Sequence, residues 1–411
     1  MPEEVELPKG EGVLVRSPAS IKLLSGNIEV WGAEFDEISV QMDGVELLVT
    51  SSIDSKVAID GHYVKLENPI PDWWEELPEI VAGKNTIFIG RVDSGKSSTV
   101  VFTINRIVRS GSTVSVIDSD VGQSDLGPPG VISSKDVGRP VIHTKLLEPD
   151  FMYFIGDKTP SGHFLPMVKG LLDALNRSRS DTVLINTTGF VDGGAARALK
   201  RFKVEFLDPD IVVLIEKEEG DLNHIAKMIP KDVKVLKVKS PVGDRTKNRN
   251  YRIAVRRALL RRYLSGAATR KLDLREIELM NTFLMTGRVK DEYIPFLERI
   301  LGVGVRWMEE SPDMLIALTE GEVDRRKIAM LSELLNKEVR IGPVNVYEGL
   351  YVGLVQGREC RGVGIIQSMD IREGWMSVLT KYEGQVEGIA LGYIRFNAEG
   401  EELGSRGMNL P

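Results

Sequence analysis

The nine residues Gly90–Ser98, with the sequence GRVDSGKSS, have the types and spacing of a phosphate-binding loop. They fit the pattern G-x-x-x-x-G-K-[ST] without a mismatch. The glycines allow successive backbone N–H groups to point into one concavity, and the helix that follows adds about half a positive charge at its start. Lys96 would reach the β- and γ-phosphates of a nucleoside triphosphate, and the Ser97 hydroxyl would bind Mg²⁺. The nucleotide contacts expected here are Gly90, Arg91, Val92, Asp93, Ser94, Gly95, Lys96, Ser97 and Ser98.

Two carboxylates, Asp118 and Asp120, end the next apolar stretch after this loop, in the segment DSDVGQSDLGPPG. A carboxylate at the carboxyl end of a neighbouring strand is where Mg²⁺ coordination and activation of the second substrate are arranged. Side chains alternate along a strand, so only one of the two faces the γ-phosphate directly. We expect Asp120 to be the catalytic carboxylate and a metal ligand, and Asp118 to assist the metal through water.

The segment Asp120-Val-Gly-Gln123 also matches D-x-x-G-Q, a GTPase motif in which the glutamine orients water. A GTPase reads guanine with N-K-x-D after a later strand, and the stretch 210–221 ends without it. The Asn336–Lys337 pair lies outside the nucleotide region and continues with Glu and Val. Only 24 residues separate Lys96 from Asp120, which leaves no room for a long switch loop. We therefore reject the GTPase interpretation and keep Gln123 as a candidate substrate contact.

A run of basic residues between Asp244 and Asp273 contains no acidic residue. If residues 244–265 form a helix, four arginines at i, i+4, i+7 and i+11 share one stripe. An ordinary solvated helix intersperses Glu with Lys, so this stripe is expected to meet an anion: a nucleotide, a polynucleotide or both. A guanidinium pairs bidentately with phosphate. An acidic patch of the same protein is the alternative partner. The stripe consists of Arg245, Arg249, Arg252 and Arg256.

Two short polar segments, 156–160 and 186–190, each follow an apolar stretch. In a parallel sheet both would lie at the carboxyl edge, beside the phosphate-binding loop. Hydroxyl groups can donate to phosphate oxygens, and an aromatic ring can stack on a base. Alone, each segment is only a turn. Their shared edge makes them candidate substrate contacts: Thr159, Thr187, Thr188, Gly189 and Phe190.

The elements that must position these residues fall into three regions. Residues 11–70 contain alternating stretches that predict a small antiparallel β-domain, with strands at 12–18, 20–26, 27–35, 37–44, 45–52, 56–61 and 62–68. The segment 68–84 has three prolines and the Trp73–Trp74 pair, and we interpret it as a linker or docking segment. Apolar strands then alternate with helices, which predicts a mainly parallel sheet with strands at 85–90, 113–120, 151–157, 181–189, 210–218 and 233–240. The last region returns to strands.

Length and composition narrow the class of protein. A chain of 411 residues predicts two or three domains, and 42% hydrophobic with 27% charged residues is typical of a soluble globular protein. No run of eighteen apolar residues occurs and the N-terminus is acidic, so we expect no membrane span and no signal peptide. The single cysteine excludes a disulfide framework and favours a cytoplasmic protein. A net charge of −7 argues against coating of nucleic acid but allows a local basic groove.

Together these motifs resemble the polynucleotide 5′-hydroxyl kinases. That family includes the kinase subunit of the eukaryotic pre-mRNA cleavage complex, the ribosomal-RNA processing kinases and their archaeal counterparts. The resemblance rests on GRVDSGKSS, on D-x-D-x-G-Q followed by Pro-Gly at 118–130, on Thr159–Pro160, and on T-x-G-aromatic at 187–190. The arginine-rich lid at 245–262 and the segment LLSGNIEVWGAEF at 23–35 complete it. It covers residues 11–265 well and the remainder loosely.

The resemblance implies an α/β fold in which a central P-loop kinase domain is flanked by two β-rich domains. The implied boundaries are 1–80 for the N-terminal antiparallel β-domain, which helps to hold the adenine, 81–265 for the kinase domain, and 266–411 for a C-terminal mainly β domain. Lys96 and Ser97 then bind phosphate and Mg²⁺, and Asp120 is the base on the 5′-hydroxyl. The clasp, residues 187–190, grips the polynucleotide end, and lid arginines act on the transferring phosphate: Arg252, with Arg245 or Arg256.

Two departures from the family pattern matter. The clasp aromatic is usually Trp and here is Phe190, which stacks less strongly, and the lid has a different length. The expected activity is transfer of the ATP γ-phosphate to the 5′-hydroxyl end of RNA, or of DNA as well, with Mg²⁺. A non-catalytic ATP-bound scaffold of an RNA-processing complex and a P-loop ATPase without a polynucleotide acceptor are the alternatives. A binding-only protein does not need Lys96, Ser97, Asp120 and the arginine stripe together, which favours the enzyme.

Overall fold

The computed structural model describes residues 2–241 and 248–405. The chain separates into two compact units, 1–260 and 261–411, and the described residues of each are treated by themselves. The first unit contains both the β-domain and the P-loop region of the sequence-based scheme. The boundaries at 80/81 and 265/266 remain predictions.

The first seven strands form an antiparallel sheet, as the alternating pattern predicts. Its order is β1-β7-β2-β6-β3-β4, with β5 paired to β2. Val13 and Val15 on the longest strand are buried, whereas the exposed side chain of Arg16 follows them. The strands are β1 (Glu3–Leu7), β2 (Glu11–Ser25), β3 (Glu29–Val30), β4 (Ala33–Glu34), β5 (Glu37–Val40), β6 (Glu46–Thr50) and β7 (Ser55–Glu67).

Two strand breaks predicted in this sheet, near Pro18 and at Gly61, are wrong. Strands β2 and β7 each run through the expected turn and pair with each other along most of their length. A register shift between Arg16 and Ser20 accommodates the proline in β2. Gly61 has a positive φ of 144°, and a Cβ there would lie 2.7 Å from the Cβ of Ala19. This glycine therefore permits a close backbone approach inside a strand and does not mark a turn.

The segment 68–84 contains helix α1 (Asp72–Val81) and docks onto the core. Trp74 is only 2% exposed, and its ring stacks on Phe102 with 4.9 Å between centroids. Its indole Nε1 donates to the Thr99 hydroxyl at 3.0 Å. The segment therefore docks onto the core, because Trp74 buries apolar area against the helix that follows the phosphate-binding loop, and its part as a linker between domains stays a prediction.

The central sheet has the order β11-β10-β9-β12-β8-β13-β14. Strands β9, β12, β8, β13 and β14 run parallel to one another, and β10 runs antiparallel to its neighbours β9 and β11. The mainly parallel sheet is confirmed, whereas the sequence analysis missed β10, whose serines and charges interrupt the apolar pattern. The strands are β8 (Asn85–Gly90), β9 (Val114–Ser119), β10 (Val131–Val137), β11 (Phe151–Phe154), β12 (Thr182–Thr187), β13 (Ile211–Glu216) and β14 (Lys234–Lys239).

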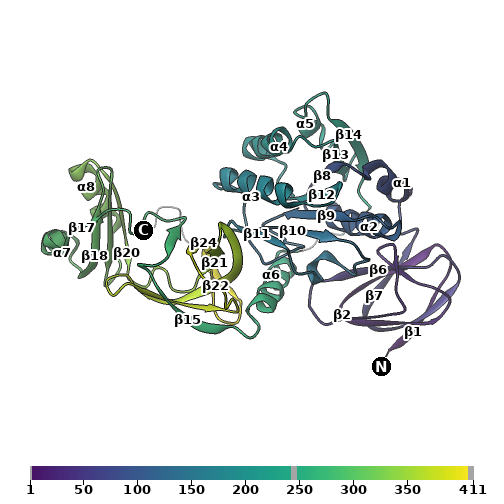
Figure 1. Cartoon of the computed structure of the whole chain (residues 1–411), viewed down its shortest axis with the longest axis horizontal. Coiled ribbons are helices and arrows are strands. Elements are labelled where there is room, and N and C mark those ends of the chain that lie inside the picture. The colour runs from purple at the N-terminus through teal and green to yellow at the C-terminus, as the bar shows by residue number, and fades with distance from the viewer. Residues whose placement is uncertain (1, 242–247, 406–411) are drawn as a thin grey trace. The chain divides into compact units, whose positions relative to one another are not determined.

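Helices cover both faces of this sheet (Figure 1). Along β8, Ile87 and Ile89 pack with α3 and α4, whereas Phe88 packs on the opposite face with α1, α2 and the N-terminal sheet. The predicted basic helix is confirmed as α6, and Arg245 lies outside the described residues. The helices are α2 (Lys96–Arg109), α3 (Phe164–Arg177), α4 (Gly193–Leu207), α5 (Asn223–Ala226), α6 (Arg249–Leu264) and the 3₁₀ turn η1 (Thr144–Leu146).

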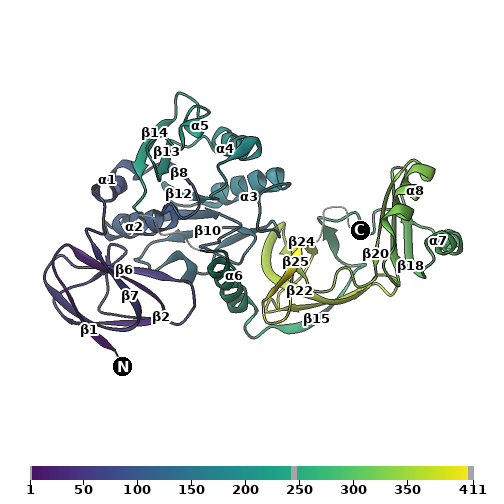
Figure 2. The same ribbon diagram turned by 180° about the vertical axis from the view of Figure 1, so that it is seen from behind.

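The second unit is mainly β, as expected. A larger sheet has the order β15-β23-β22-β21-β24-β16 with β25 on β24, and a smaller one has the order β17-β18-β19-β20. Helices α7 and α8 cover one face of the smaller sheet (Figure 2). The elements are β15 (Ala268–Asp273), β16 (Glu278–Met280), β17 (Arg288–Val289), η2 (Asp291–Tyr293), α7 (Ile294–Leu301), β18 (Val305–Glu310), β19 (Met314–Thr319), α8 (Arg325–Leu335), β20 (Glu338–Pro343), β21 (Leu350–Gln356), β22 (Glu359–Asp370), β23 (Trp375–Thr380), β24 (Gly388–Phe396) and β25 (Glu402–Ser405).

Among the residues that the structure describes, no helix combines the length and the apolar character needed to cross a bilayer.

We predict that Trp74→Ala destabilises the first unit by about 3–5 kcal/mol, because it removes a buried ring from the core shared by the two sheets. The measurement is the urea midpoint followed by far-UV circular dichroism. The control is Leu165→Ala, since this leucine is 85% exposed and its loss is expected to change stability by less than about 0.5 kcal/mol. Equal midpoints for the two variants would contradict the assigned packing.

Candidate active site

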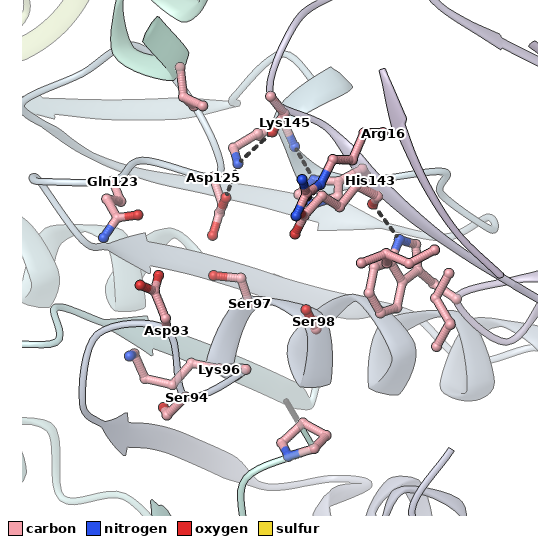
Figure 3. A pocket seen from close by; sticks show the side chains of 18 of the residues that line it. Arg16, Asp93, Ser94, Lys96, Ser97, Ser98, Gln123, Asp125, His143 and Lys145 are labelled. Carbon is pink, nitrogen blue, oxygen red and sulfur yellow. Dashed lines mark hydrogen bonds and ion pairs between the residues drawn. The ribbon is translucent and has the colours of Figure 1, made fainter. Parts of the chain in front are cut away.

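A cavity of about 510 Å³ in the first unit brings together the phosphate-binding loop, the segment after β9, the N-terminal sheet and α6 (Figure 3). Most of the residues predicted from the sequence to contact the nucleotide or to act in catalysis line it. Gly90, Arg91 and Asp118 do not, although they adjoin it in sequence. The predicted residues that line the cavity are Val92, Asp93, Ser94, Gly95, Lys96, Ser97, Ser98, Asp120, Gln123, Arg252 and Arg256.

The phosphate-binding loop turns sharply from β8 into α2. Asp93 and Gly95 have φ angles of 58° and 88°, so the backbone is left-handed twice within three residues. Helix α2 then starts at Lys96, and no described side chain caps its first turn. The N–H groups of that turn thus remain available to an anion, and the helix dipole favours negative charge there. This is the local geometry that the glycine pattern predicts.

The Lys96 side chain is buried and lies along the loop. Its Nζ donates to the carbonyl oxygens of Gly90, at 3.0 Å, and Arg91, at 2.8 Å. Burial lowers the pKa of Lys96, while the nearby carboxylates of Asp120 and Asp125 act in the opposite direction. An ammonium held by only two carbonyls at the loop can exchange them for phosphate oxygens.

Asp118 organises the loop that carries the other carboxylates. It is 2% exposed, and burial together with the charges of its carboxylate neighbours raises its pKa to about 8. Both of its oxygens accept hydrogen bonds: Oδ1 from the N–H of Asp120 at 3.0 Å and the side chain of Asn186 at 3.2 Å, Oδ2 from the N–H of Asp125 at 2.5 Å and of Leu126 at 3.1 Å. Asp118 therefore shapes the turn after β9.

Asp120 faces the cavity from the same turn. Its Oδ1 accepts from the backbone N–H groups of Gly122, at 3.0 Å, and Gln123, at 3.1 Å. Burial raises the pKa of Asp120, and the positive charge of Lys96 opposes that rise. A carboxylate with one oxygen held by the backbone is a fixed acceptor, which suits general-base chemistry or the alignment of a hydroxyl.

The sequence analysis missed a second carboxylate at the cavity, Asp125. Its Oδ1 lies 2.9 Å from Nζ of Lys145 in η1, and its side chain lines the cavity together with Ser97. Burial alone would raise the pKa of Asp125, but the positive charge of Lys145 outweighs burial and lowers the pKa to about 2. Asp125 lies in the same segment as Asp118 and Asp120, so its chemistry was visible in the sequence. Lys145, in contrast, lies in no sequence motif that would mark it as part of the site.

The lid arginines are only partly brought to the cavity. Arg252 pairs with Asp93 of the phosphate-binding loop at 2.9 Å. Its Nε is buried and has no hydrogen-bond partner among the described residues. Arg256 lines the cavity one turn later, whereas Arg249 is exposed and does not line it. The stripe therefore presents two arginines from α6 toward the phosphate-binding loop.

The clasp lies at the end of β12, next to the loop but outside the cavity. Thr187 and Thr188 are buried; the Thr187 hydroxyl donates to the carbonyl of Phe88 at 2.7 Å. Nζ of Lys200 in α4 donates to Thr187 Oγ1 at 2.9 Å and to the Thr188 carbonyl at 2.6 Å. Phe190 is half-buried against the α3–α4 core, and Thr159 is exposed on its own turn.

The clasp and the phosphate-binding loop pack directly on each other. A Cβ on Gly189 would lie 2.5 Å from the backbone nitrogen of Val92, so only glycine fits there. Arg91 does not turn into the cavity. Its guanidinium pairs with Asp192, directly after the clasp, and with Asp221 at 3.1 Å. Any displacement of the clasp is therefore transmitted to the loop that binds phosphate.

Two buried lysines on α4 were also missed. Lys200 holds the clasp, and burial lowers its pKa well below the usual value. Nζ of Lys203 donates to the Ser119 hydroxyl at 2.9 Å, and burial lowers its pKa to about 8 despite the charges of Asp120 and Asp118. Both lysines lie on the buried face of the helix with Leu199. In the sequence alone, lysines at these positions would indicate a solvent-exposed helix face.

The N-terminal sheet gives the cavity an apolar wall. Trp31 is held in place by a hydrogen bond from its indole Nε1 to the carbonyl of Glu46 at 3.0 Å. Trp74 from α1 packs 6.2 Å from it, measured between ring centroids. An apolar wall beside a phosphate-binding loop suits a nucleotide base. The other apolar lining residues here are Leu14, Leu48, Leu66 and Pro69, and Arg16, Gly44, Glu46, Glu67 and Asn68 complete this part of the lining.

We predict that Gly189→Ala weakens ATP binding on the order of a hundredfold, because the added methyl displaces Val92 and with it the phosphate-binding loop. The measurement is titration with a fluorescent ATP analogue. The matched control is Gly194→Ala on α4, where a Cβ meets nothing within 4 Å. ATP binding in Gly189→Ala that equals the control would show that the contact is unimportant.

We predict a pH signature of Lys203. Between pH 8 and pH 10.5 the unfolded chain keeps the lysine proton and the folded chain releases it, so the free energy of unfolding rises with pH. The contribution is on the order of 3 kcal/mol across this window. In Lys203→Met this rise is lost. Unfolding midpoints at several pH values measure it, with Lys169→Met as the exposed control; parallel curves for wild type and Lys203→Met would exclude the effect.

Comparison with known proteins places the chain among P-loop proteins of one family. Residues 90–266 match the family described as the P-loop of the mRNA cleavage and polyadenylation factor CLP1. A chain in the solved structure of the wild-type Clp1p–Pcf11p complex superposes with a TM-score of 0.65 over 96% of this chain and 98% of that one, at 13% identity. That likeness shows that the fold is shared.

Sequence relatives give the family. The polyribonucleotide 5′-hydroxyl-kinase of Pyrococcus furiosus is 31% identical over 326 residues, which cover 77% of this chain and 88% of the relative. The enzyme of the same name from Thermococcus kodakarensis is 31% identical over 349 residues, covering 82% of this chain and 95% of the relative. The chain therefore belongs to the Clp1-related family of polyribonucleotide 5′-hydroxyl-kinases.

Proposed function

We propose that this protein is a kinase that transfers the γ-phosphate of ATP to the 5′-hydroxyl end of RNA, in RNA processing or repair. One observation carries the proposal: Lys96, Asp120 and Arg252 from three separate elements line a single cavity. Phosphoryl transfer needs in-line positioning of donor and acceptor and neutralisation of charge, and these side chains supply both. The related enzymes of Pyrococcus and Thermococcus bear the name of this activity.

In the proposed reaction ATP lies with its base against the wall formed by Trp31 and Trp74 and its phosphates at the loop. Lys96 leaves the loop carbonyls and donates to the β- and γ-phosphates. Arg252 and Arg256 neutralise charge on the transferring group, for which the buried Nε of Arg252 is a suitable donor. The lid position 245 lies outside the described residues, so its part stays a prediction.

Asp120 is the proposed base. Its Oδ1 is held by two backbone N–H groups, which fixes the side chain while the carboxylate remains at the cavity. It accepts the proton of the 5′-hydroxyl, or aligns that hydroxyl, as the oxygen–phosphorus bond forms and the bond to the β-phosphate oxygen of ADP breaks. Gln123, next in the same turn, contacts the substrate.

Mg²⁺ is the proposed metal, and the residues present fit it. Ser97, Asp120 and Asp125 offer oxygen donors alone, the ligand type that Mg²⁺ prefers. No cluster of three acidic, histidine or cysteine side chains occurs in the described part of the chain, and a site completed by nucleotide phosphates needs none. Bound Mg²⁺ would help to neutralise the negative charge of the nucleotide phosphates. Asp118 supports this site through the loop, because its oxygens already accept hydrogen bonds.

The clasp is the proposed grip on the polynucleotide end. Phe190 offers a ring for stacking on the terminal base, and Gly189 keeps the clasp against the phosphate-binding loop. Thr159 and Arg249 are exposed and can reach a backbone phosphate. Thr187 and Thr188 act by holding the strand end. The acceptor is RNA, with DNA as a second substrate.

Cys360, the single cysteine, is buried and forms no disulfide, which fits the proposed cytoplasmic location.

We predict that Lys96→Ala and Asp120→Asn abolish transfer of label from γ-labelled ATP to a 5′-hydroxyl RNA, and that Arg252→Ala slows it on the order of a thousandfold. The exposed Arg201→Ala serves as the control. Reactions with RNA, with DNA and without acceptor show where the label goes. Full activity of Asp120→Asn would remove the base assignment, and release of phosphate without acceptor would favour an ATPase instead.

A further inference from the structure

We propose that Asp125, held in place by Lys145, is the carboxylate that contacts Mg²⁺ beside Ser97 in this enzyme. The inference rests on the proposed function and adds two residues to it: Asp125 as the carboxylate beside the metal, and Lys145 as a positioning residue that acts through it. Neither residue was part of the site expected from the sequence, in which Asp118 and Asp120 carried the metal.

Ser97 and Asp125 lie together at the cavity. The Nδ2 group of Asn186 donates to Ser97 Oγ at 3.3 Å, which uses one lone pair of that oxygen and leaves the other for a metal ion. Asp125 lines the same cavity beside Ser97. A metal ion held by Ser97 Oγ would therefore have the Asp125 carboxylate next to it.

Asp118 is a poor candidate for the same role. Both of its oxygens accept N–H donors from the turn and from Asn186, and its side chain does not line the cavity. Asp125, in contrast, uses Oδ1 for Lys145 and lines the cavity beside Ser97. Figure 3 shows the Asp125 carboxylate pointing toward Ser97, with a dashed line that joins it to Lys145.

Lys145 ties this carboxylate to a second part of the fold. Its side chain is 9% exposed, and its Nζ lies 2.9 Å from Asp125 Oδ1 and donates to the carbonyl of Gly44 at 3.3 Å. Gly44 belongs to the turn between β5 and β6 of the N-terminal sheet. The Lys145 ammonium therefore links Asp125 to the N-terminal sheet and restricts the rotamer of the Asp125 side chain.

The alternative is a purely structural link in which Lys145 and Asp125 join the loop to the N-terminal sheet. The two readings differ in one measurable quantity, the gain in ATP affinity that Mg²⁺ produces. A structural link changes stability and leaves this gain untouched. A carboxylate beside the metal changes the Mg²⁺ concentration at which the gain appears.

The experiment titrates a fluorescent ATP analogue into the full-length protein, in EDTA and at increasing Mg²⁺, without RNA. The variants are Asp125→Asn, Lys145→Met, Lys145→Arg and the double variant Asp125→Asn/Lys145→Met. The matched control pair is Asp150→Asn and Lys135→Met, because Lys135 and Asp150 form an exposed ion pair of 2.7 Å in the same region of the chain. Thermal unfolding of every variant reports its fold.

In Asp125→Asn we expect binding in EDTA to be kept and the half-saturating Mg²⁺ concentration to rise at least tenfold. Lys145→Met shifts it in the same direction, and Lys145→Arg restores most of the loss. The double variant is no worse than Asp125→Asn, because Lys145 acts through the carboxylate. Both control variants behave as wild type.

Wild-type Mg²⁺ dependence in a folded Asp125→Asn overturns the proposal. If Asp125→Asn does not fold, the comparison of Lys145→Met with Lys145→Arg decides: equal Mg²⁺ dependence in these two and in wild type overturns it as well. Failure of the wild type to label 5′-hydroxyl RNA would instead contradict the proposed function, since the Mg²⁺ titration contains no acceptor and stays readable.

Discussion

The buried carboxylate of Asp118 is the constraint on which the site depends. A carboxylate inside a protein needs hydrogen-bond donors, and here the donors are backbone N–H groups of the turn that follows β9. Satisfying one buried group thus folds the turn around it. That fold places both Asp120 and Asp125 at the cavity, whereas Asp118 itself does not line it.

Two buried lysines on helix α4 support the same edge of the sheet. Lys200 and Lys203 on α4 reach the ends of β12 and β9 and donate to Thr187 and Ser119. Burial lowers the pKa of both lysines, a cost in stability that a solvated lysine does not carry. They hold the strand ends that carry the clasp and the turn after β9. The clasp and the phosphate-binding loop are also joined directly, where Gly189 meets Val92.

Much of the fold was predictable because it depends on local patterns. The strand before Lys96, the helix after it and the basic helix α6 lie where spacing placed them. The wrongly placed strand breaks share one physical source, which is that tertiary contacts override local turn signals. Pro18 and Gly61 look like breaks, yet long-range pairing between β2 and β7 carries both strands through. Trp74 sits among prolines, and its burial against Phe102 draws that segment into a helix.

The sequence by itself determined the chemistry of phosphate binding, because Gly95, Lys96 and Ser97 act through backbone geometry that nine consecutive residues can specify. It also identified the family, through motifs that are each local. Only the tertiary structure decided which carboxylate lies beside Ser97 at the cavity and which cation holds it. Lys145 comes to Asp125 from twenty residues along the chain and is anchored on Gly44, a hundred residues away. Such a contact depends on how separate elements pack, and no spacing in the sequence encodes it.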